Sequence, residues 1–326
     1  MNSSNASSNE KEKFKANILT DIFKNLKSIY ILRKIFDNTF KKVELKIIKY
    51  NKDIQQRLDI TLNNYKKYSE IEIEIIPCKE KCGKFINIKY KYQQYYHIFF
   101  DNNKEEIKRY KLIKDDKVEK ITIIIDYKVK SLEKLFDKCD CIKSIYFKNF
   151  TRNNINNMSS MFSSCSSLQE INLSNFNTDN VIKMNLMFSF CSSIKEIDLS
   201  KLNTSNVTEM RSMFFGCSSL KEINLSNFDT RNLTDIRGMF FGCFSLEKIN
   251  LSNFNTNKVI NMKGMFLNCS SLKELNISNF NFDNVIDMNQ MFLGCSDELK
   301  MKIQSQNKNI RKEAFEFQEV KRKKSY

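Results

Sequence analysis

A cysteine recurs every 26 residues along the second half of this chain, and this strict interval restricts the possible folds more than any other feature. The clear copies carry Cys165, Cys191, Cys217, Cys243, Cys269 and Cys295. One interval earlier stands Cys139, after Leu135 and Phe136 where later copies have Met-Phe, so a first, divergent copy begins near Val129. Periods of roughly 20 to 50 residues indicate a solenoid, in which each unit buries its apolar side against its neighbours.

The first part of each copy has helical spacing. Met184, Met187, Phe188 and Cys191 fall at i, i+3, i+4 and i+7, which predicts a short helix with one apolar face. Three copies also place an Asn three residues before an acid at the start of this segment, as a helix capping box does. These pairs are Asn206 with Glu209, Asn232 with Asp235 and Asn284 with Asp287.

The second part of each copy predicts a strand and a turn. In "SIKEIDLS" Ile197 and Leu199 alternate with polar residues, which is the spacing of a half-buried strand. Strands stack about 4.8 Å apart, whereas helices pack about 8 to 10 Å apart, so such a stack must bend with its strands inside. The expected fold is an α/β repeat solenoid in the shape of a horseshoe, with short helices and a parallel sheet.

The recurring Phe and Cys residues are expected to form two buried columns. With helices about 8 to 10 Å apart, neighbouring cysteines lie beyond the roughly 7 Å Cα limit for a disulfide. A metal site would need His or further thiols beside each Cys, and the chain has a single histidine, His97, in an apolar run where a structural role is expected. We therefore predict buried, unreactive thiols and no metal or cofactor site. Cys78 and Cys82 are read as thiols of a turn, with half of a zinc site as the alternative.

The phrase L-x-x-I-x-L-S-x-F-x-T-x-x-V-x-x-M-x-x-M-F-x-x-C resembles the BspA-like leucine-rich-repeat proteins over about residues 129–303. The resemblance implies a leucine-rich-repeat-like, right-handed horseshoe used for adhesion or protein contacts, without catalysis. Surface members of that family carry secretion or anchoring signals. This sequence shows neither an apolar signal region nor the roughly 18 apolar residues of a membrane span. A cytoplasmic location is therefore expected, with "KRKK" (Lys321 to Lys324) as a candidate nuclear signal and surface adhesion as an alternative function.

Five regions are expected along the chain. Residues 1–13 are predicted to be disordered, 14–69 to form short helices, and 70–128 to be a β-rich cap built from "EIEIEII", "YYHIFF" and "KITIIIDYKV". Residues 129–303 form the solenoid and 304–326 a cap helix and basic tail. At the end of the solenoid, "DELKMKI" predicts a last strand and "NIRKEAFEF" a closing helix.

The helical region before the β-rich cap resembles a divergent F-box. The similarity lies in a "YILRKIF" helix, a basic turn and a "VELKIIKYNKDIQQRL" helix, followed by a repeat domain. It implies a substrate adaptor that docks on a ubiquitin ligase. Ser28-Ile29-Tyr30 stands where the family has Leu-Pro, and a plain helical cap is the alternative.

The residue inventory argues against an enzyme. There is one His, no glycine-rich phosphate loop, and no paired carboxylates or nucleophile with a base, so no catalytic group set is expected. The net charge of +16 arises at the two ends, because residues 151–300 carry 13 Lys/Arg against 14 Asp/Glu. Nucleic acid is accordingly not the expected partner.

The predicted strands point polar side chains to the concave side of the solenoid. The expected protein-binding ladder is Asn172, Ser174, Asp198, Ser200, Asn224, Ser226, Asn250, Ser252, Asn276 and Ser278. Glu170, Glu196, Glu222 and Glu274 line its edge, interrupted by Lys248. This pattern favours a non-catalytic scaffold that binds a protein of unknown identity and no small-molecule substrate. The alternative is that these columns are only solvated faces.

Overall fold

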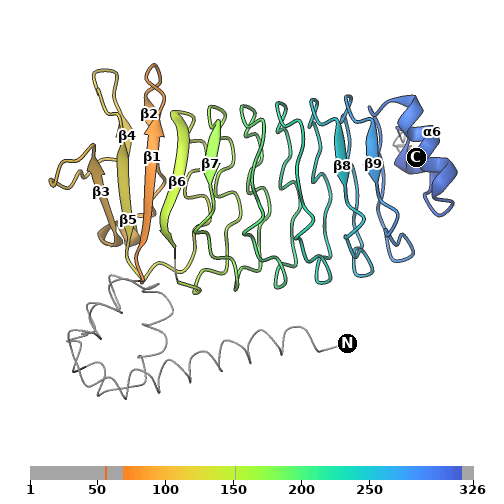
Figure 1. Ribbon diagram of the computed structural model, residues 1–326, viewed down its shortest axis with the longest axis horizontal. Helices are drawn as coiled ribbons and strands as arrows, with labels where there is room; N and C mark the ends of the chain where they lie inside the picture. Colours follow the sequence, from red (N-terminus) through yellow and green to blue (C-terminus); the bar gives the residue numbers. More distant parts are fainter. Residues whose placement is uncertain (1–55, 57–68, 151, 318–326) are drawn as a thin grey trace, which may run out of the picture. The chain divides into compact units, whose positions relative to one another are not determined.

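A computed structural model describes residues 56, 69–150 and 152–317 of the chain. The chain divides into two units, Met1–Glu70 and Ile71–Tyr326, and the described residues lie almost entirely in the second. The predictions for residues 1–13, for the F-box-like helices and for the "KRKK" tail lie outside the described residues. The second unit starts with antiparallel strands, continues as a row of coils, and reaches a helix at its far end (Figure 1).

The strands before the repeats form where the sequence alternates. They are β1 (Ile71–Pro77), β3 (Tyr96–Phe100) and β5 (Ile121–Ile125), and each buries every second residue. Together with β6 (Ile142–Phe150) and β7 (Glu170–Asn172) they make one sheet in the order β3-β5-β1-β6-β7. Pairing is antiparallel up to β6 and parallel between β6 and β7, so the early strands extend the sheet of the repeats. Short elements flank this sheet: β2 (Gly83–Lys84), η1 (Tyr90–Tyr95) and β4 (Lys111–Leu112).

Each 26-residue repeat makes one coil, named below by its cysteine. On one side, short parallel strands such as β8 (Lys248–Asn250) and β9 (Glu274–Asn276) pair between coils. On the other side, single parallel bridges recur at steps of 26 residues, from Ser131 and Asn157 to Asn261 and Asp287. The repeat region is therefore mostly β-structured, with little helix.

The short helices predicted in the coils are wrong, because these segments form consecutive turns. In the Cys191 coil, the backbone N–H of Met187 donates to the carbonyl of Met184 at 3.3 Å, and that of Cys191 to Phe188 at 3.1 Å. Leu186 and Phe190 have a φ of 57° each, in the left-handed region that an α-helix does not use. Two turns thus place apolar residues at i, i+3, i+4 and i+7 without a helix.

Hydrogen bonds to the next coil explain why a helix does not form. The backbone N–H groups of Leu186 and Phe188 donate to the carbonyls of Arg211 and Met213, both at 2.9 Å. In a helix the same groups would donate to carbonyls four residues earlier. Because they bond between coils, the turn side is held together in the manner of a sheet.

The predicted capping boxes are wrong for the same reason. The side-chain amide of Asn206 donates to the carbonyl of Asp179 in the preceding coil at 2.7 Å, and Asn232 and Asn284 make the equivalent bonds to Ser205 and Asn257 at 2.8 Å. These asparagines therefore join coils, and they start no helix.

The spacing of the coils removes the reason for a horseshoe. Phe162, Phe188, Phe214, Phe240, Phe266 and Phe292 form a buried column whose neighbouring ring centroids lie 5.3 to 5.7 Å apart. This is close to the strand spacing of about 4.8 Å and far below helix spacing. Both sides of the stack have similar pitch, and Figure 1 shows the coils side by side in a row.

The recurring cysteine provides a hydrogen bond inside the core. The Sγ of Cys191 donates to the carbonyl of Phe162 at 3.1 Å, and five further cysteines repeat this bond at 3.0 to 3.3 Å. All six are buried free thiols. The position thus holds a small apolar side chain whose thiol adds a second donor to a buried carbonyl that already accepts from a backbone N–H.

A buried threonine ladder connects the coils in the same way. Thr204 donates through Oγ1 to the carbonyl of Asp229 at 3.0 Å and accepts from the N–H of Asp229 at 2.8 Å. Thr178, Thr230 and Thr256 make the equivalent pair of bonds. A single hydroxyl thereby satisfies two backbone groups of the next coil.

The C-terminal elements differ from the prediction. The "DELKMKI" segment is helix α6 (Asp297–Gln306), since the Ser296 side chain caps it by accepting from the N–H of Leu299, and Leu299 and Ile303 face the core at i, i+4. The predicted closing helix is reduced to η2 (Lys312–Ala314). Phe315 stacks on Phe292 at 5.3 Å, so this end continues the phenylalanine column by one ring.

Candidate strand-side groove

A groove of about 1150 Å³ runs along the strand side of the coils. It crosses the coils from β7 to β9 and reaches α6 at one end. Its lining residues define the strand-side groove: Gln169, Glu170, Ile171, Glu196, Ile197, Asp198, Leu199, Ser200, Glu222, Ile223, Asn224, Ser226, Lys248, Ile249, Asn250, Ser252, Asn253, Glu274, Leu275, Asn276 and Lys302. The floor is an aliphatic column, and the walls are polar.

The groove brings together most of the predicted ladder. Seven ladder residues line it: Asp198, Ser200, Asn224, Ser226, Asn250, Ser252 and Asn276. Asn172, Ser174 and Ser278 lie outside the lining, although they are exposed on equivalent positions. The strand alternation therefore identified which side chains face outward, and the tertiary structure decided how far the groove extends.

The ladder asparagines have a local structural task that the sequence analysis missed. The side-chain oxygen of Asn224 accepts from the backbone N–H of Ser226 at 3.0 Å, and the same bond occurs in five coils at 2.9 to 3.1 Å. Such a bond, from a side chain to the N–H two residues on, is an Asx turn. The recurring Asn-x-Ser was the available signal. In the Asn residues the amide N–H groups and the second lone pair of the oxygen then remain for a ligand.

The groove carries an excess of negative charge. Its lining contains five carboxylates and two lysines, which leaves a formal charge of −3. Lys248 pairs with Glu222 at 3.6 Å, where both side chains are well exposed. Glu196 lies in the same column without an ion pair among the described residues. The field in the groove is therefore negative along most of its length.

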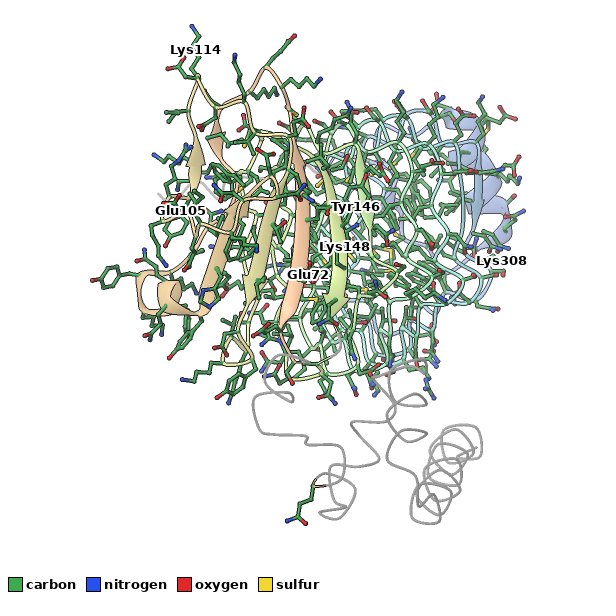
Figure 2. The ribbon with its side chains drawn as sticks, turned by 60° about the vertical axis from the view of Figure 1, so that its left-hand side comes forward. Glu72, Glu105, Lys114, Tyr146, Lys148 and Lys308 are labelled. Atoms are coloured by element: carbon green, nitrogen blue, oxygen red, sulfur yellow. The ribbon has the colours of Figure 1, made fainter. Side chains whose placement is uncertain are left out.

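The N-terminal end of the groove is bounded by β6 and β1. The hydroxyl of Tyr146 donates to Glu170 at 2.8 Å, and Lys148 reaches Glu74 of β1 at 3.4 Å. Figure 2 shows Tyr146 and Lys148 on β6 beside Glu72 on the neighbouring strand β1. Burial and the hydrogen bond to Glu170 raise the pKa of Tyr146, so its hydroxyl stays a donor.

One ladder carboxylate is stabilised in its charged form. The backbone N–H of Ser200 donates to Asp198 at 2.9 Å, and this bond lowers the pKa of the Asp198 carboxyl. Asp198 therefore presents a negative charge to the groove at neutral pH.

The remaining candidates from the sequence are separate from the groove. His97 lies on β3 and contacts Glu106 through Nδ1 at 3.2 Å. Across the part of the chain that the structure describes, no three His, Cys, Asp or Glu side chains are placed to hold a metal ion. Burial raises the pKa of Cys217 to about 12 and that of Cys295 to about 11, so the column thiols are protonated at neutral pH.

Comparison with protein families gives one match. The model for "Mycoplasma protein of unknown function, DUF285" matches residues 130–224 and 218–325, which is more than half of the chain. The chain belongs to the DUF285 family. Neither a curated protein nor a solved structure matches it.

The family match covers the coils and the C-terminal elements of this DUF285 protein. The two matched segments together span the Cys139 coil to the residues beyond α6. The description assigns no function. No helix within the described ranges is long and apolar enough to cross a membrane.

Residues of the opposite, turn side were missed in the sequence analysis. Phe190 and Phe244 are about half exposed, at 51% and 49%. Phe215 stacks on Phe241 with ring centroids 4.5 Å apart and on the edge of Phe190 at 4.9 Å. The signal was present in the repeat itself, because each of these residues stands where another coil has serine.

Proposed function

We propose that this DUF285 protein is a non-catalytic scaffold of the BspA-like leucine-rich-repeat type, which binds an extended, basic segment of a partner protein in the strand-side groove. The observation that carries this proposal is the elongated groove with five carboxylates and two lysines. Complementary charge steers a partner to such a surface and selects against acidic ones. A polyanion such as nucleic acid would be repelled.

The floor and walls of the groove favour a polypeptide. The aliphatic floor is formed by Ile171, Ile197, Ile223, Ile249 and Leu275, and amide groups stand beside it at regular intervals. An extended peptide supplies apolar side chains, backbone carbonyls and cationic groups that match these three features.

A direct binding measurement tests the proposal. The full-length chain is titrated with a fluorescent extended peptide of alternating lysine and serine, and with a glutamate-serine peptide. We expect binding of the basic peptide alone, weakened by salt. The double variant Glu196→Lys/Glu222→Lys should bind at least about tenfold more weakly.

The matched control is Glu247→Lys. Glu247 is exposed one residue before Lys248 and does not line the groove. It makes one Glu→Lys change outside the groove, which is half the charge change of the double variant, so its affinity should stay within about twofold of wild type. Equal loss in the control and the groove variant, or equal binding of both peptides, would contradict the proposal.

A narrower proposal is that the chain serves as an F-box-like substrate adaptor of a ubiquitin ligase. It rests on the sequence resemblance within residues 14–69. A Skp1-type adaptor protein should then co-purify with the full chain and be lost on deletion of residues 1–60. Retention after that deletion would exclude these residues as the dock.

Two further proposals concern location and catalysis. The cytoplasmic location and the surface-adhesion alternative are separated by imaging the tagged full-length chain. The proposal that the chain is no enzyme rests on its residue inventory, with one histidine and isolated carboxylates.

A further inference from the structure

Four phenylalanines on the turn side depart from the repeat. They define the phenylalanine cluster: Phe190, Phe215, Phe241 and Phe244. Phe190 stands where the preceding coil has Ser164, and Phe215 and Phe241 stand where earlier coils have Ser163 and Ser189. Phe244 replaces a serine found in several other coils. Since coils with serine at these places have the same turns and stacking, the fold does not require these rings.

Three rings of the cluster are in direct contact, and Phe244 lies three residues after Phe241 in the same coil. The Phe215 and Phe241 rings are nearly parallel, 11° apart, and Phe190 meets Phe215 edge to face. Gly216 makes room for the Phe190 ring, because a Cβ on Gly216 would lie 2.8 Å from a carbon of that ring. A positive φ alone does not demand glycine here, since Ser164 and Asn268 adopt it at the equivalent position. The glycine is thus fitted to the exposed ring.

Six coils around the cluster lack charged residues on this side, and Lys138 and Asp140 of the preceding Cys139 coil bound this region beside Phe190. Six consecutive coils contribute a stretch without a single charged residue: 160–168, 186–194, 212–220, 238–246, 264–272 and 290–296. These stretches define the uncharged face. The buried Met, Phe, Cys and Leu or Ile of each stretch belong to the core, so the depletion of charge that matters is at the outward Ser, Phe, Gly, Leu and Asn positions. Depletion of charge and enrichment of aromatic residues are the compositional signs of an interface core.

We propose that the uncharged face, centred on the phenylalanine cluster, is an interface with a second copy of this chain. An anionic membrane or nucleic acid would require clustered cations, and the face has none. A second copy supplies the same uncharged surface, with rings repeated at the same coil pitch. The repeat region carries 13 Lys/Arg against 14 Asp/Glu over residues 151–300, so two such regions approach without net repulsion.

The length of the uncharged face suits a symmetric dimer. Six coils at about 4.8 Å give a face roughly 29 Å long. A standard interface buries about 800 Å² per partner, which is roughly 28 Å across if square. A two-fold axis pairs one surface with itself, and it is the commonest arrangement in homo-oligomers. This proposal is independent of the groove, which lies on the opposite side of each coil.

Sedimentation velocity of the full-length chain over a range of concentrations tests the proposal. We expect a monomer–dimer equilibrium for the wild type. The variant F190S/F215S/F241S/F244S introduces only residues that other coils already carry, so it should fold. Its dimer dissociation constant should rise at least about thirtyfold, as expected for loss of central aromatic contacts.

Two controls make the outcome decisive. The groove variant Glu196→Lys/Glu222→Lys should dimerise as wild type, and dimerisation should persist at high salt, because it does not depend on charge. A wild type that stays monomeric at all concentrations overturns the proposal, as does a serine variant that dimerises equally well. Binding of a monomeric wild type to uncharged lipid vesicles, lost in the serine variant, would assign the face to lipid and overturn the proposal too.

Discussion

The two sides of each coil use the same core but differ in how uniform they are. The strand side repeats Glu, Asn or Asp, and Ser with little variation, and the Asn-x-Ser or Asp-x-Ser unit forms an Asx turn in five coils. The turn side is uniform only in its buried Met, Phe and Cys. Its outward positions change from serine in early coils to phenylalanine and leucine in later ones.

This difference shows which residues of a repeat protein are informative about its function. A residue that recurs in every coil can be explained by what one coil needs from the next. Exposed phenylalanine rings occur in three coils at positions where other coils have serine. The fold does not explain them. Departures from the repeat are thus more informative about partners than the repeat itself.

The largest expected effect is a loss of folding stability at high pH, because the buried cysteine column belongs to the core that both sides of each coil share. Burial raises the pKa of Cys217 to about 12 and raises the pKa of the other column thiols, whereas the thiols of the unfolded chain titrate near about 8.5. The folded state therefore holds protons that the unfolded state releases, so folding stability is full below that value and falls as the pH rises. Each buried thiol costs on the order of 1 kcal/mol per pH unit.

Urea unfolding at pH 8, 9 and 10 checks this expectation. The midpoint should fall steeply above pH 9. A midpoint that stays constant up to pH 10 would contradict the buried thiol column. At pH 8, a thiol reagent should label Cys82 and Cys78 in the folded chain and the column only after unfolding, because those two are the thiols with solvent access.

Two adjacent phenylalanines separate the core from the surface. Phe214→Ala should lower the free energy of unfolding by about 3 to 5 kcal/mol, because it empties one place in the buried column. Phe215→Ala, one residue later, should cost about 1 kcal/mol or less, since this ring is half-buried and other coils carry serine there. Chemical denaturation of both variants measures the difference. Equal losses would show that Phe215 belongs to the core and would weaken the case for an interface.

The threonine ladder provides a smaller effect. Thr204→Val keeps the shape but leaves the backbone N–H and carbonyl of Asp229 without their hydroxyl partner, at an expected cost of about 1 to 3 kcal/mol. Thr208→Val is the matched control in the same coil, because sister coils have Ile182 and Ile260 at this exposed position. Denaturation curves that coincide for the two variants would disprove the role of the ladder.

Much of the core could be predicted from the sequence. The 26-residue period placed Phe188, Cys191 and their counterparts at one depth, and the structure confirms both columns as buried. The alternation in "EIEIEII" predicted β1, and the sheet does run from the early strands into the coils. Of the ladder, the sequence identified the outward side chains but gave neither the limits of the groove nor the Asx turns.

The secondary structure on the turn side could not be predicted from spacing. Two turns with left-handed Leu186 and Phe190 produce the same apolar pattern as a helix. The choice depends on whether an N–H finds a partner within its own segment or in the next coil, and a single repeat carries no information about the latter. In "DELKMKI", the spacing of Leu299 and Ile303 is compatible with both a strand and a helix. The N-cap at Ser296 favours the helix, and the segment forms α6.

The sequence by itself determined the period of the stack, its buried columns and the charge of its surfaces. These follow from the order of apolar and polar residues, which is a local property of the chain. Only the tertiary structure decided the route of each coil and the extent of the groove and of the uncharged face. The reason is that the hydrogen bonds and ring contacts that fix them join residues about one repeat apart, and these form only once the coils are stacked.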